Sequence, residues 1–235
     1  MVIPAHNEAA LLPRCLRATL SAATCLPIPV LTVVVLDACD DESAALVGRF
    51  GPDVHFVRID ARSVGAARAA GFRYANSVCD SDDARTWYAT TDADSRVDPD
   101  WLLRQTAADA DMVLGVVRVP EWRHHPSAVA RHYLLKYQTD LKYQTDGPGH
   151  NHIHGANLGC RADAYWRAGG FAALPSGEDV DLVKRFENAG YRIRRDAKLS
   201  VATSDRRHGR APGGFAAHLR AVSRAVFPRS AGEQV

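Results

Sequence analysis

Two hydrophobic patterns alternate along the first half of the chain. Continuous β-branched runs, of which residues 30–36 (VLTVVVL) are the clearest, are typical of strands buried on both faces of a sheet. Between such runs apolar residues recur at helical spacing, as in the Ala-rich segment after Ser63, a residue able to cap a helix. The patterns predict strands at 2–3, 30–36, 54–59, 86–91 and 111–117, and helices from Pro13, at 41–50, at 63–77 and from Asp98-Pro99.

Strands that alternate with helices of this length predict an α/β fold, with a mainly parallel central sheet and helices on both faces. In such sheets ligands bind beyond the carboxyl ends of the strands. Three of the predicted strands end in polar residues, namely His6-Asn7, Asp37 and Asp92-Ala93-Asp94. We therefore expect a ligand site at this edge of the sheet.

The second half of the chain is less regular. Residues 136–146 contain a tandem repeat, KYQTDL followed by KYQTD, which we expect to lengthen a helix or a loop. Residues 178–188 predict a helix that ends before Gly190. A short helix is expected between the segments Gly155-Ala156-Asn157 and Gly169-Gly170-Phe171.

A further amphipathic segment, residues 215–227, lies near the C-terminus. Its apolar residues recur at helical spacing beside several arginines. Such a stripe usually packs onto the body of a protein, and peripheral contact with a membrane is the alternative. The stripe consists of Phe215, Leu219, Val222 and Val226.

Composition limits the classes of protein that the chain can belong to. Its 235 residues, 46% hydrophobic and 24% charged, fit one globular domain, with or without a small appendage. A net charge of +2 gives no reason to expect a nucleic-acid partner. The five cysteines have no paired spacing, which indicates reduced thiols in a cytoplasmic protein. No apolar run approaches the roughly 20 residues of a membrane span.

Asp92 and Asp94 are the first candidates for chemistry. Two carboxylates at positions i and i+2, just beyond a buried strand, can bind a divalent cation and a ribose together. Hard oxygen ligands suit Mg²⁺ or Mn²⁺. The alternative is an Asp-rich turn in which Asp94 or Asp98 caps the next helix.

Asp37 and Arg68 are candidates for nucleotide contacts. Asp37 ends an apolar strand, where an acid can accept from a nucleobase N–H or a ribose hydroxyl. The small residues 65–67 let a ligand approach the start of a helix, and Arg68 can face a phosphate or a base there. Simple helix packing, with Arg68 in solvent, is the alternative.

Three further groups complete the candidates. Asp179 begins a helix and can act as a general base, or it can simply complement the helix dipole. The alternating histidines 150, 152 and 154 would share a face in a strand, where acceptor contacts or loop polarity are more plausible than zinc. The basic loop around His208 can fold over a diphosphate, or it is an exposed tail.

Six segments in this order resemble the family 2 glycosyltransferases of GT-A fold. They are Ile3-Pro4-Ala5-His6-Asn7-Glu8, Leu36-Asp37-Ala38-Cys39-Asp40-Asp41-Glu42-Ser43, the helix start at 65–71, Asp92-Ala93-Asp94, the stretch from Gly155-Ala156-Asn157 to Gly169-Gly170-Phe171, and Glu178-Asp179-Val180-Asp181-Leu182. Leu36 and Ala69 depart from the family pattern, and both lie in the nucleotide-contacting segments.

The resemblance implies a metal-dependent transferase that moves a sugar from a UDP- or GDP-linked donor to an acceptor hydroxyl, with Mn²⁺ or Mg²⁺ as cofactor. It implies that Asp37 and Arg68 contact the nucleobase, and that Asp92 contacts the ribose. The metal would be bound by Asp94, with His208 as a further ligand or phosphate contact. The implied nucleotide-sugar site consists of Pro4, Ala5, Asn7, Glu8, Asp37, Arg68, Asp92, Ala93 and Asp94.

On the acceptor side, the resemblance implies inversion at the anomeric carbon, with Asp179 as the general base. The implied acceptor site consists of His154, Gly155, Ala156, Asn157 and Glu178. We expect a GT-A domain over residues 1–204, divided into a nucleotide-sugar half (1–117) and an acceptor half (118–204), followed by a basic loop and helix (205–235). A catalytically silent relative that only binds nucleotide sugars is the alternative, and Asp179 argues against it.

Overall fold

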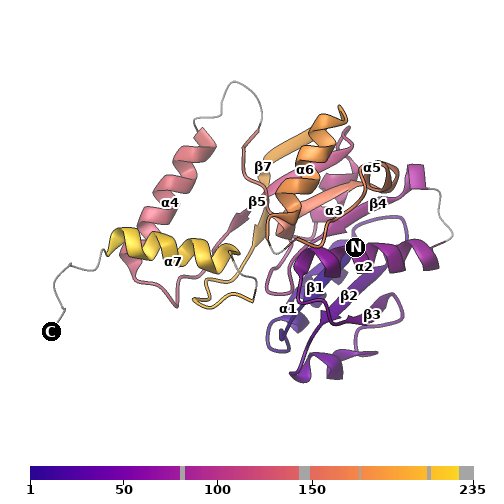
Figure 1. Cartoon of the computed structure of the whole chain (residues 1–235), viewed down its shortest axis with the longest axis horizontal. Helices are drawn as coiled ribbons and strands as arrows, with labels where there is room; N and C mark the ends of the chain where they lie inside the picture. Colours follow the sequence, from indigo (N-terminus) through magenta and orange to yellow (C-terminus); the bar gives the residue numbers. More distant parts are fainter. Residues whose placement is uncertain (80–82, 143–148, 175, 211–212, 228–235) are drawn as a thin grey trace.

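The computed structural model describes residues 1–235 apart from 80–82, 143–148, 175, 211–212 and 228–235. The described residues form one seven-stranded sheet in the order β3-β2-β1-β4-β6-β5-β7 (Figure 1). The strands are β1 (Val2–Ala5), β2 (Thr32–Asp37), β3 (Val54–Ile59), β4 (Trp87–Thr90), β5 (Met112–Arg118), β6 (Leu158–Arg161) and β7 (Ile193–Ala202).

The sheet is mainly parallel, as the sequence predicts. Strands β1 to β4 pair in parallel, and so do β5 and β7. The exception is β6, which runs antiparallel between β4 and β5 and pairs Leu158 with Thr90. Because β6 begins where β4 ends, the short 3₁₀ turn Gly155–Asn157 lies at the same edge of the sheet as Asp92 and Asp94.

Helices cover both faces of the sheet, because alternate residues of each buried strand point to opposite sides. Val33 and Val35 pack on the face covered by α2, α5 and α6, whereas Val34 and Leu36 pack on the α1 side. The other helix on the α1 side, α3, buries Trp101 completely. The helices are α1 (Leu12–Thr24), α2 (Val64–Val78), α3 (Trp101–Thr106), α5 (Ala162–Arg167) and α6 (Glu178–Asn188).

Two further helices, α4 (Ser127–Lys142) and α7 (Phe215–Val226), pack on each other beside the sheet (Figure 1). Leu219 and Val222 of α7 are buried against Val129 and Tyr133 of α4. The apolar stripe of the C-terminal segment therefore packs within the protein, which corrects the alternative of membrane contact through this stripe. No helix in the described part of the chain is both long and apolar enough to cross a bilayer.

Two helix predictions are wrong in extent. Residues 41–50 form only a 3₁₀ turn, Glu42–Leu46, because Val47 turns to an extended conformation and Gly48 adopts φ 74°. Helix α3 begins at Trp101, later than the Asp98-Pro99 start that the sequence predicts. The Asp98 side chain pairs with Arg118 on β5 and does not cap the helix.

The Asn157 side chain ties three elements together at the centre of the protein. Its Nδ2 donates to the carbonyl oxygens of Val116 (2.9 Å) and Leu199 (2.8 Å), and its Oδ1 accepts from Trp101 Nε1 (2.8 Å). Gly115 permits this close approach, since a Cβ there would lie 2.2 Å from Asn157 Nδ2. Asn157 is fully buried, so it holds the site together from within rather than contacting an acceptor directly.

We expect the substitution Asn157→Ala to lower the free energy of unfolding by about 2–4 kcal/mol, because it leaves buried polar groups without partners. Denaturant unfolding followed by circular dichroism measures this. Asn188→Ala, at an exposed position near the end of α6, is the matched control and should change stability by less than about 0.5 kcal/mol. Equal effects of the two substitutions would contradict the proposed role of Asn157.

Candidate functional site

The loops that leave the first three strands have unusual backbone conformations. Three non-glycine residues of the described chain have positive φ: Asn7 (55°), Ala38 (49°) and Arg62 (49°). They follow β1, β2 and β3, respectively, at the carboxyl end of the sheet. Such conformations persist where the surrounding structure holds them, and they cluster at functional sites.

A cavity of about 370 Å³ opens at these strand ends, and we call it the strand-end cavity. Pro4 and Ala5 of β1, Asp37 of β2 and the Asp92–Asp94 turn after β4 line one side of it. The opposite side comes from the segment between β7 and α7, including Ser204, Arg206 and Arg210. This set includes most of the nucleotide-sugar residues that the sequence predicts, and it adds a basic C-terminal wall.

The Asp37 carboxylate organises the rim of the strand-end cavity. Its two oxygens accept from the backbone N–H groups of Ala61 (2.7 Å), Arg62 (2.8 Å) and Ser63 (2.8 Å). These bonds hold the turn between β3 and α2, where the Ser63 side chain caps the helix as predicted. Asp37 is 4% exposed, and through these bonds it shapes one wall of the strand-end cavity.

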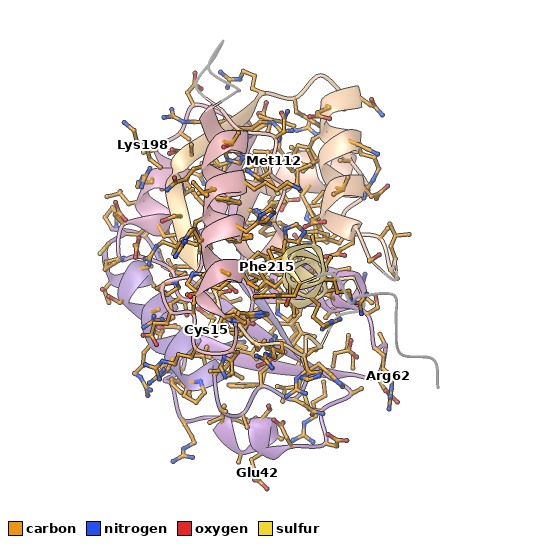
Figure 2. All side chains as sticks on the ribbon, turned by 90° about the vertical axis from the view of Figure 1, so that its left-hand side faces the viewer. Cys15, Glu42, Arg62, Met112, Lys198 and Phe215 are labelled. Atoms are coloured by element: carbon orange, nitrogen blue, oxygen red, sulfur yellow. The ribbon has the colours of Figure 1, made fainter. Side chains whose placement is uncertain are left out.

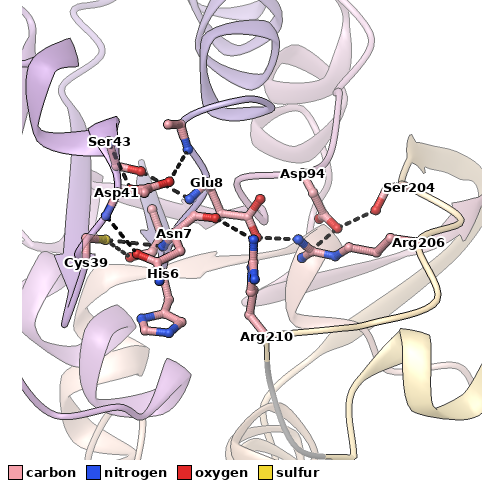
Figure 3. Close-up of polar contacts among 12 residues, drawn as sticks. His6, Asn7, Glu8, Cys39, Asp41, Ser43, Asp94, Ser204, Arg206 and Arg210 are labelled. Atoms are coloured by element: carbon pink, nitrogen blue, oxygen red, sulfur yellow. Dashed lines mark hydrogen bonds and ion pairs between the residues drawn. The ribbon is translucent and has the colours of Figure 1, made fainter.

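Asn7 has a similar positioning role beside the strand-end cavity. Its Nδ2 donates to Asp40 (2.5 Å), and its Oδ1 accepts from the backbone N–H groups of Asp40 (2.9 Å) and Asp41 (3.3 Å). These bonds join the loop after β1 to the loop after β2 (Figure 3). Asn7 therefore fixes the two loops relative to each other.

Arg206 lies between two carboxylates at the strand-end cavity (Figure 3). Its Nη1 is 2.5 Å from Glu8 Oε1, and its Nη2 is 2.9 Å from Asp94 Oδ2. Ser204 also donates to Asp94 Oδ2 (2.7 Å), and Arg210 donates to the Asn7 carbonyl (2.9 Å). Burial raises the pKa of Glu8 above its ordinary value, even though the adjacent Arg206 lowers it.

This arrangement is chemically suited to a cation. Glu8 and Asp94 already share one cationic partner, and carboxylate oxygens are the ligands that Mg²⁺ and Mn²⁺ prefer. Within the described residues no group of three or more His, Cys, Asp or Glu side chains is arranged to hold a metal ion. His208 is exposed and lines a shallow pocket with Asn7 and Arg207, so the structure does not bring it to Asp94 in the strand-end cavity.

Arg68 is buried beneath the site and joins three elements. Its guanidinium pairs with Glu178 of α6 and with Asp92 (2.7 Å), and its Nε donates to Thr90 of β4 (3.3 Å). Gly155 allows this packing, because a Cβ there would lie 2.5 Å from Arg68 Nη2. The guanidinium is committed to these carboxylates, so the geometry does not favour the direct base contact predicted for Arg68.

A second cavity, of about 530 Å³, adjoins the first on the side of α4, α6 and α7, and we call it the helical cavity. Asp92 lines both cavities, and so does Phe215 at the start of α7. Phe215 is labelled in Figure 2, beside the helix that is seen end-on. Asp179 lines the helical cavity, where its Oδ2 accepts from Gly155 N (2.8 Å) and its Oδ1 from Val180 N (2.8 Å). The two backbone donors orient this carboxylate in the cavity.

The three alternating histidines lie together, although residues 150–154 do not form a strand. The rings of His152 and His154 stack with centroids 5.7 Å apart, and Tyr137 of α4 stacks on His152 at 4.4 Å. His150 is buried, and one of its ring nitrogens contacts the Leu114 carbonyl oxygen (3.1 Å). His152 and His154 line the helical cavity, together with the predicted acceptor residues Gly155, Ala156 and Glu178.

The sequence pattern missed part of both cavities. Three aromatic side chains line the helical cavity: Tyr133, Tyr137 and Phe215. The amino-acid sequence alone indicates only that they pack helices together. Arg206 carries a weak signal in the run SDRRHGR, which singles out no one arginine. Their roles depend on how α7 folds back over the strand ends.

We expect the buried pair Arg68–Glu178 to be strongly coupled, because the two side chains are 3% and 7% exposed. The substitution Arg68→Met should lower the free energy of unfolding by about 3–5 kcal/mol, since it leaves the buried Glu178 carboxylate unpaired. In the Glu178→Gln background the same change should cost about 2 kcal/mol less, as a double-mutant cycle by urea unfolding would measure. The control pair is Arg192–Asp109, which is exposed on both sides and should show no measurable coupling. A coupling of similar size in both pairs would contradict the role assigned to Arg68.

The fold of this chain is similar to that of several solved structures. The S. aureus TarS 1-349 structure in complex with UDP-GlcNAc superposes with a TM-score of 0.62 at 14% identity, covering 96% of this chain and 64% of that one. The chain thus spans less than two thirds of the TarS structure. The mannosyltransferase PcManGT from Pyrobaculum calidifontis, in complex with GDP-Man and Mn²⁺, gives a TM-score of 0.62 at 18% identity over 95% of this chain and 68% of that one.

Glucosyl-3-phosphoglycerate synthase from Mycobacterium tuberculosis, in complex with Mn²⁺, UDP and glucosyl-3-phosphoglycerate, gives a TM-score of 0.57 at 17% identity, over 96% of this chain and 75% of that one. At these identities the likeness shows the fold alone. No curated protein sequence matches the chain. The model of the family described as glycosyl transferase family 2 matches residues 1–169. This match covers most of the chain's length, and the chain therefore belongs to glycosyl transferase family 2.

Proposed function

We propose that the protein transfers a sugar from a nucleoside-diphosphate donor to the hydroxyl group of an acceptor. The observation that carries this proposal is the meeting of the two cavities at Asp92, with Asp94 on one side and Asp179 on the other. Such a transfer needs a donor site and an acceptor site that share one reacting centre, with a base on the acceptor side.

The strand-end cavity is the proposed donor site. Its position beyond the carboxyl ends of parallel strands is where nucleotides bind in open α/β sheets. Asp37 and Asp92 both line this cavity, and we assign the wall beside the base to Asp37 and the ribose contact to Asp92. Family membership supports this assignment, and structural neighbours have been solved with UDP-GlcNAc and with GDP-Man. Either UDP or GDP as the donor nucleotide is compatible with the proposal.

Asp94 is the proposed ligand for Mn²⁺ or Mg²⁺, and Glu8 faces the same position. A bound divalent ion would supply Lewis-acid neutralisation of the leaving diphosphate. Two structural neighbours were solved with Mn²⁺. The metal role of His208 stays a prediction from the sequence, since its side chain lies outside the strand-end cavity.

Asp179 is the proposed general base of an inverting displacement. Its carboxylate takes the proton of the acceptor hydroxyl, and the hydroxyl oxygen forms a bond to the anomeric carbon of the donor. The bond from that carbon to the diphosphate oxygen breaks, and the electron pair leaves with the diphosphate. We assign neutralisation of the departing charge to Arg206 and Arg210, which line the proposed donor site.

The catalytically silent alternative would keep the donor cavity and lose the base. The position of Asp179 in the helical cavity favours the enzyme, because the carboxylate is held there by two backbone N–H groups. A carboxylate that only capped the α6 N-terminus would have no need to line a cavity beside Asp92.

Substitution of the two acids should separate binding from chemistry. Asp179→Asn should reduce turnover by about 10²–10⁴-fold with donor affinity almost unchanged, since an amide cannot take the proton. Asp94→Asn should abolish the metal dependence of donor binding. Calorimetry with UDP- and GDP-sugars, with and without Mn²⁺, measures affinity, and nucleotide release measures turnover.

Asp181→Asn is the control for the base, because Asp181 lies two residues further along α6 and pairs with Arg185 instead. It should leave turnover within about twofold of the unsubstituted protein. Full turnover in Asp179→Asn would show that the base is assigned wrongly. Failure of all donors to bind in the presence of metal would remove the transferase proposal itself.

Arg206 makes a separate prediction about the metal. A divalent ion at Asp94 must displace its guanidinium, so Mn²⁺ without nucleotide should bind weakly. Arg206→Gln should strengthen that binding by about tenfold or more and weaken nucleoside-diphosphate binding in the presence of Mn²⁺ by a similar factor. Arg207→Gln is the matched control, since Arg207 donates to the His124 carbonyl, outside the pair of carboxylates. Unchanged Mn²⁺ affinity in Arg206→Gln would contradict the displacement.

A further inference from the structure

The helical cavity also carries information about the acceptor. We propose that the acceptor is a neutral, hydroxyl-rich ring, such as a glycoside or a cyclitol, rather than a phosphorylated or carboxylated molecule. This inference rests on the proposed function, because it takes the helical cavity as the acceptor site. Three observations carry it: the rings of the cavity, their unpaired polar atoms, and the sign of the charge around Asp179.

The wall of the cavity is built from a series of rings. Tyr133 and Tyr137 are nearly parallel, with centroids 5.4 Å apart and an interplanar angle of 21°. The Tyr137 ring stacks on His152, with centroids 4.4 Å apart and an interplanar angle of 23°. The His152 ring stacks in turn on His154, with centroids 5.7 Å apart and an angle of 12°. Offset rings of this kind combine apolar faces with polar edges. A sugar or cyclitol ring has the matching character, since its C–H groups are apolar and its rim carries hydroxyl groups.

Two lining side chains have a buried polar atom with no hydrogen-bond partner among the residues that the structure describes. They are Tyr133, through its Oη, and His154, through its Nε2. A buried polar group without a partner costs about 1–3 kcal/mol, so it usually marks a place where a ligand or water completes the bonding. A hydroxyl group can both donate and accept, and it therefore suits a phenol and a neutral imidazole equally well.

The charge around the base disfavours an anion. Asp92, Glu178 and Asp179 line the cavity, and the buried cation among them is Arg68, which Asp92 and Glu178 already neutralise. The other lining cation, Lys136, is exposed on α4.

Two of the cavity imidazoles, those of His154 and His218, add no positive charge to this balance. Burial lowers the pKa of His154 to about 3, and it also lowers the pKa of His218. A group whose pKa lies below the working pH is neutral there, so neither ring supplies positive charge at neutral pH. A phosphate or carboxylate in the cavity would meet net negative charge, whereas a neutral polyol would meet hydrogen-bonding groups.

The volume is consistent with such an acceptor. At about 530 Å³ the cavity lies within the range of about 300–1,000 Å³ that small-molecule sites occupy. Its rings come from α4, from the segment before the Gly155–Asn157 turn and from the start of α7, so three separate elements close around the ligand.

Matched pairs of neutral and anionic molecules test the inference. With the full chain holding nucleoside diphosphate and Mn²⁺, saturation-transfer NMR and calorimetry would compare methyl glucoside with glucose 6-phosphate, and myo-inositol with inositol 1-phosphate. Phosphoglyceric acid, which is present in the structure of one structural neighbour, is a further anionic probe. We expect at least one neutral ring to bind, and its phosphorylated partner to bind about tenfold more weakly or worse.

Variants connect the binding to these side chains. Tyr133→Phe and His154→Gln should each weaken binding of the neutral ring by about fivefold or more, with nucleotide affinity unchanged. Tyr74→Phe is the control. The Tyr74 hydroxyl pairs with His55 on β3, and Tyr74 lines neither of the two cavities.

Preference for the phosphorylated partner would overturn the inference, and so would the absence of binding by every neutral ring while nucleotide binds. Unchanged ring affinity in both cavity variants would overturn it as well. These results are distinct from failure of the proposed function, which would appear as loss of nucleotide-sugar binding in the presence of metal.

Discussion

The site depends on one buried cation, the guanidinium of Arg68. It joins α2, on which it lies, to Asp92 beyond β4 and to Glu178 at the start of α6. Without it, the buried Glu178 carboxylate would have no cationic partner and would lie near the Asp92 carboxylate, which is unfavourable by several kcal/mol. Because the guanidinium draws them together, the strand-end cavity and the helical cavity meet at Asp92. Glycine at position 155 is part of the same constraint, since any side chain there would occupy the space of Arg68.

A second arginine repeats this arrangement on the outside of the site, with a different consequence. Arg206 also neutralises two carboxylates, Glu8 and Asp94, but its side chain is 26% exposed against 3% for Arg68. It lies in the segment between β7 and α7, whereas Arg68 lies within a helix. The inner pair is therefore suited to a fixed structural role. The contacts of Arg206 with Glu8 and Asp94 can be exchanged for contacts with another anion, because a guanidinium near solvent changes partners at a modest cost in free energy.

The amino-acid sequence was informative where local chemistry decides the structure. The β-branched run of 30–36 became β2, Ser63 caps α2, and the acids after β2 and β4 lie at one edge of the sheet, as predicted. It was uninformative where the outcome depends on distant partners. Nothing near Arg68 indicates that Glu178, 110 positions away, would neutralise it. The helix predicted at 41–50 failed for a similar reason, since Asp41 bonds to Ala9 across the loop and Gly48 ends the turn early.

The two cavities are lined both by residues within the family match and by residues that follow it, which bears on the choice of acceptor. The family match ends at residue 169, and it includes Asp37, Arg68, Asp92 and Asp94. Much of the remaining wall of both cavities comes from later segments: Asp179 lies on α6, and Thr203 and Phe215 line both cavities. On the proposed function, residues that contact the diphosphate and the ribose serve one type of donor, whereas the wall of an acceptor site has to suit the acceptor. Part of the proposed acceptor wall lies on α4 and α7, which pack beside the sheet. Side chains there can vary without disturbing the sheet that carries the proposed donor residues, which is the usual relation between a rigid scaffold and the segments that set specificity.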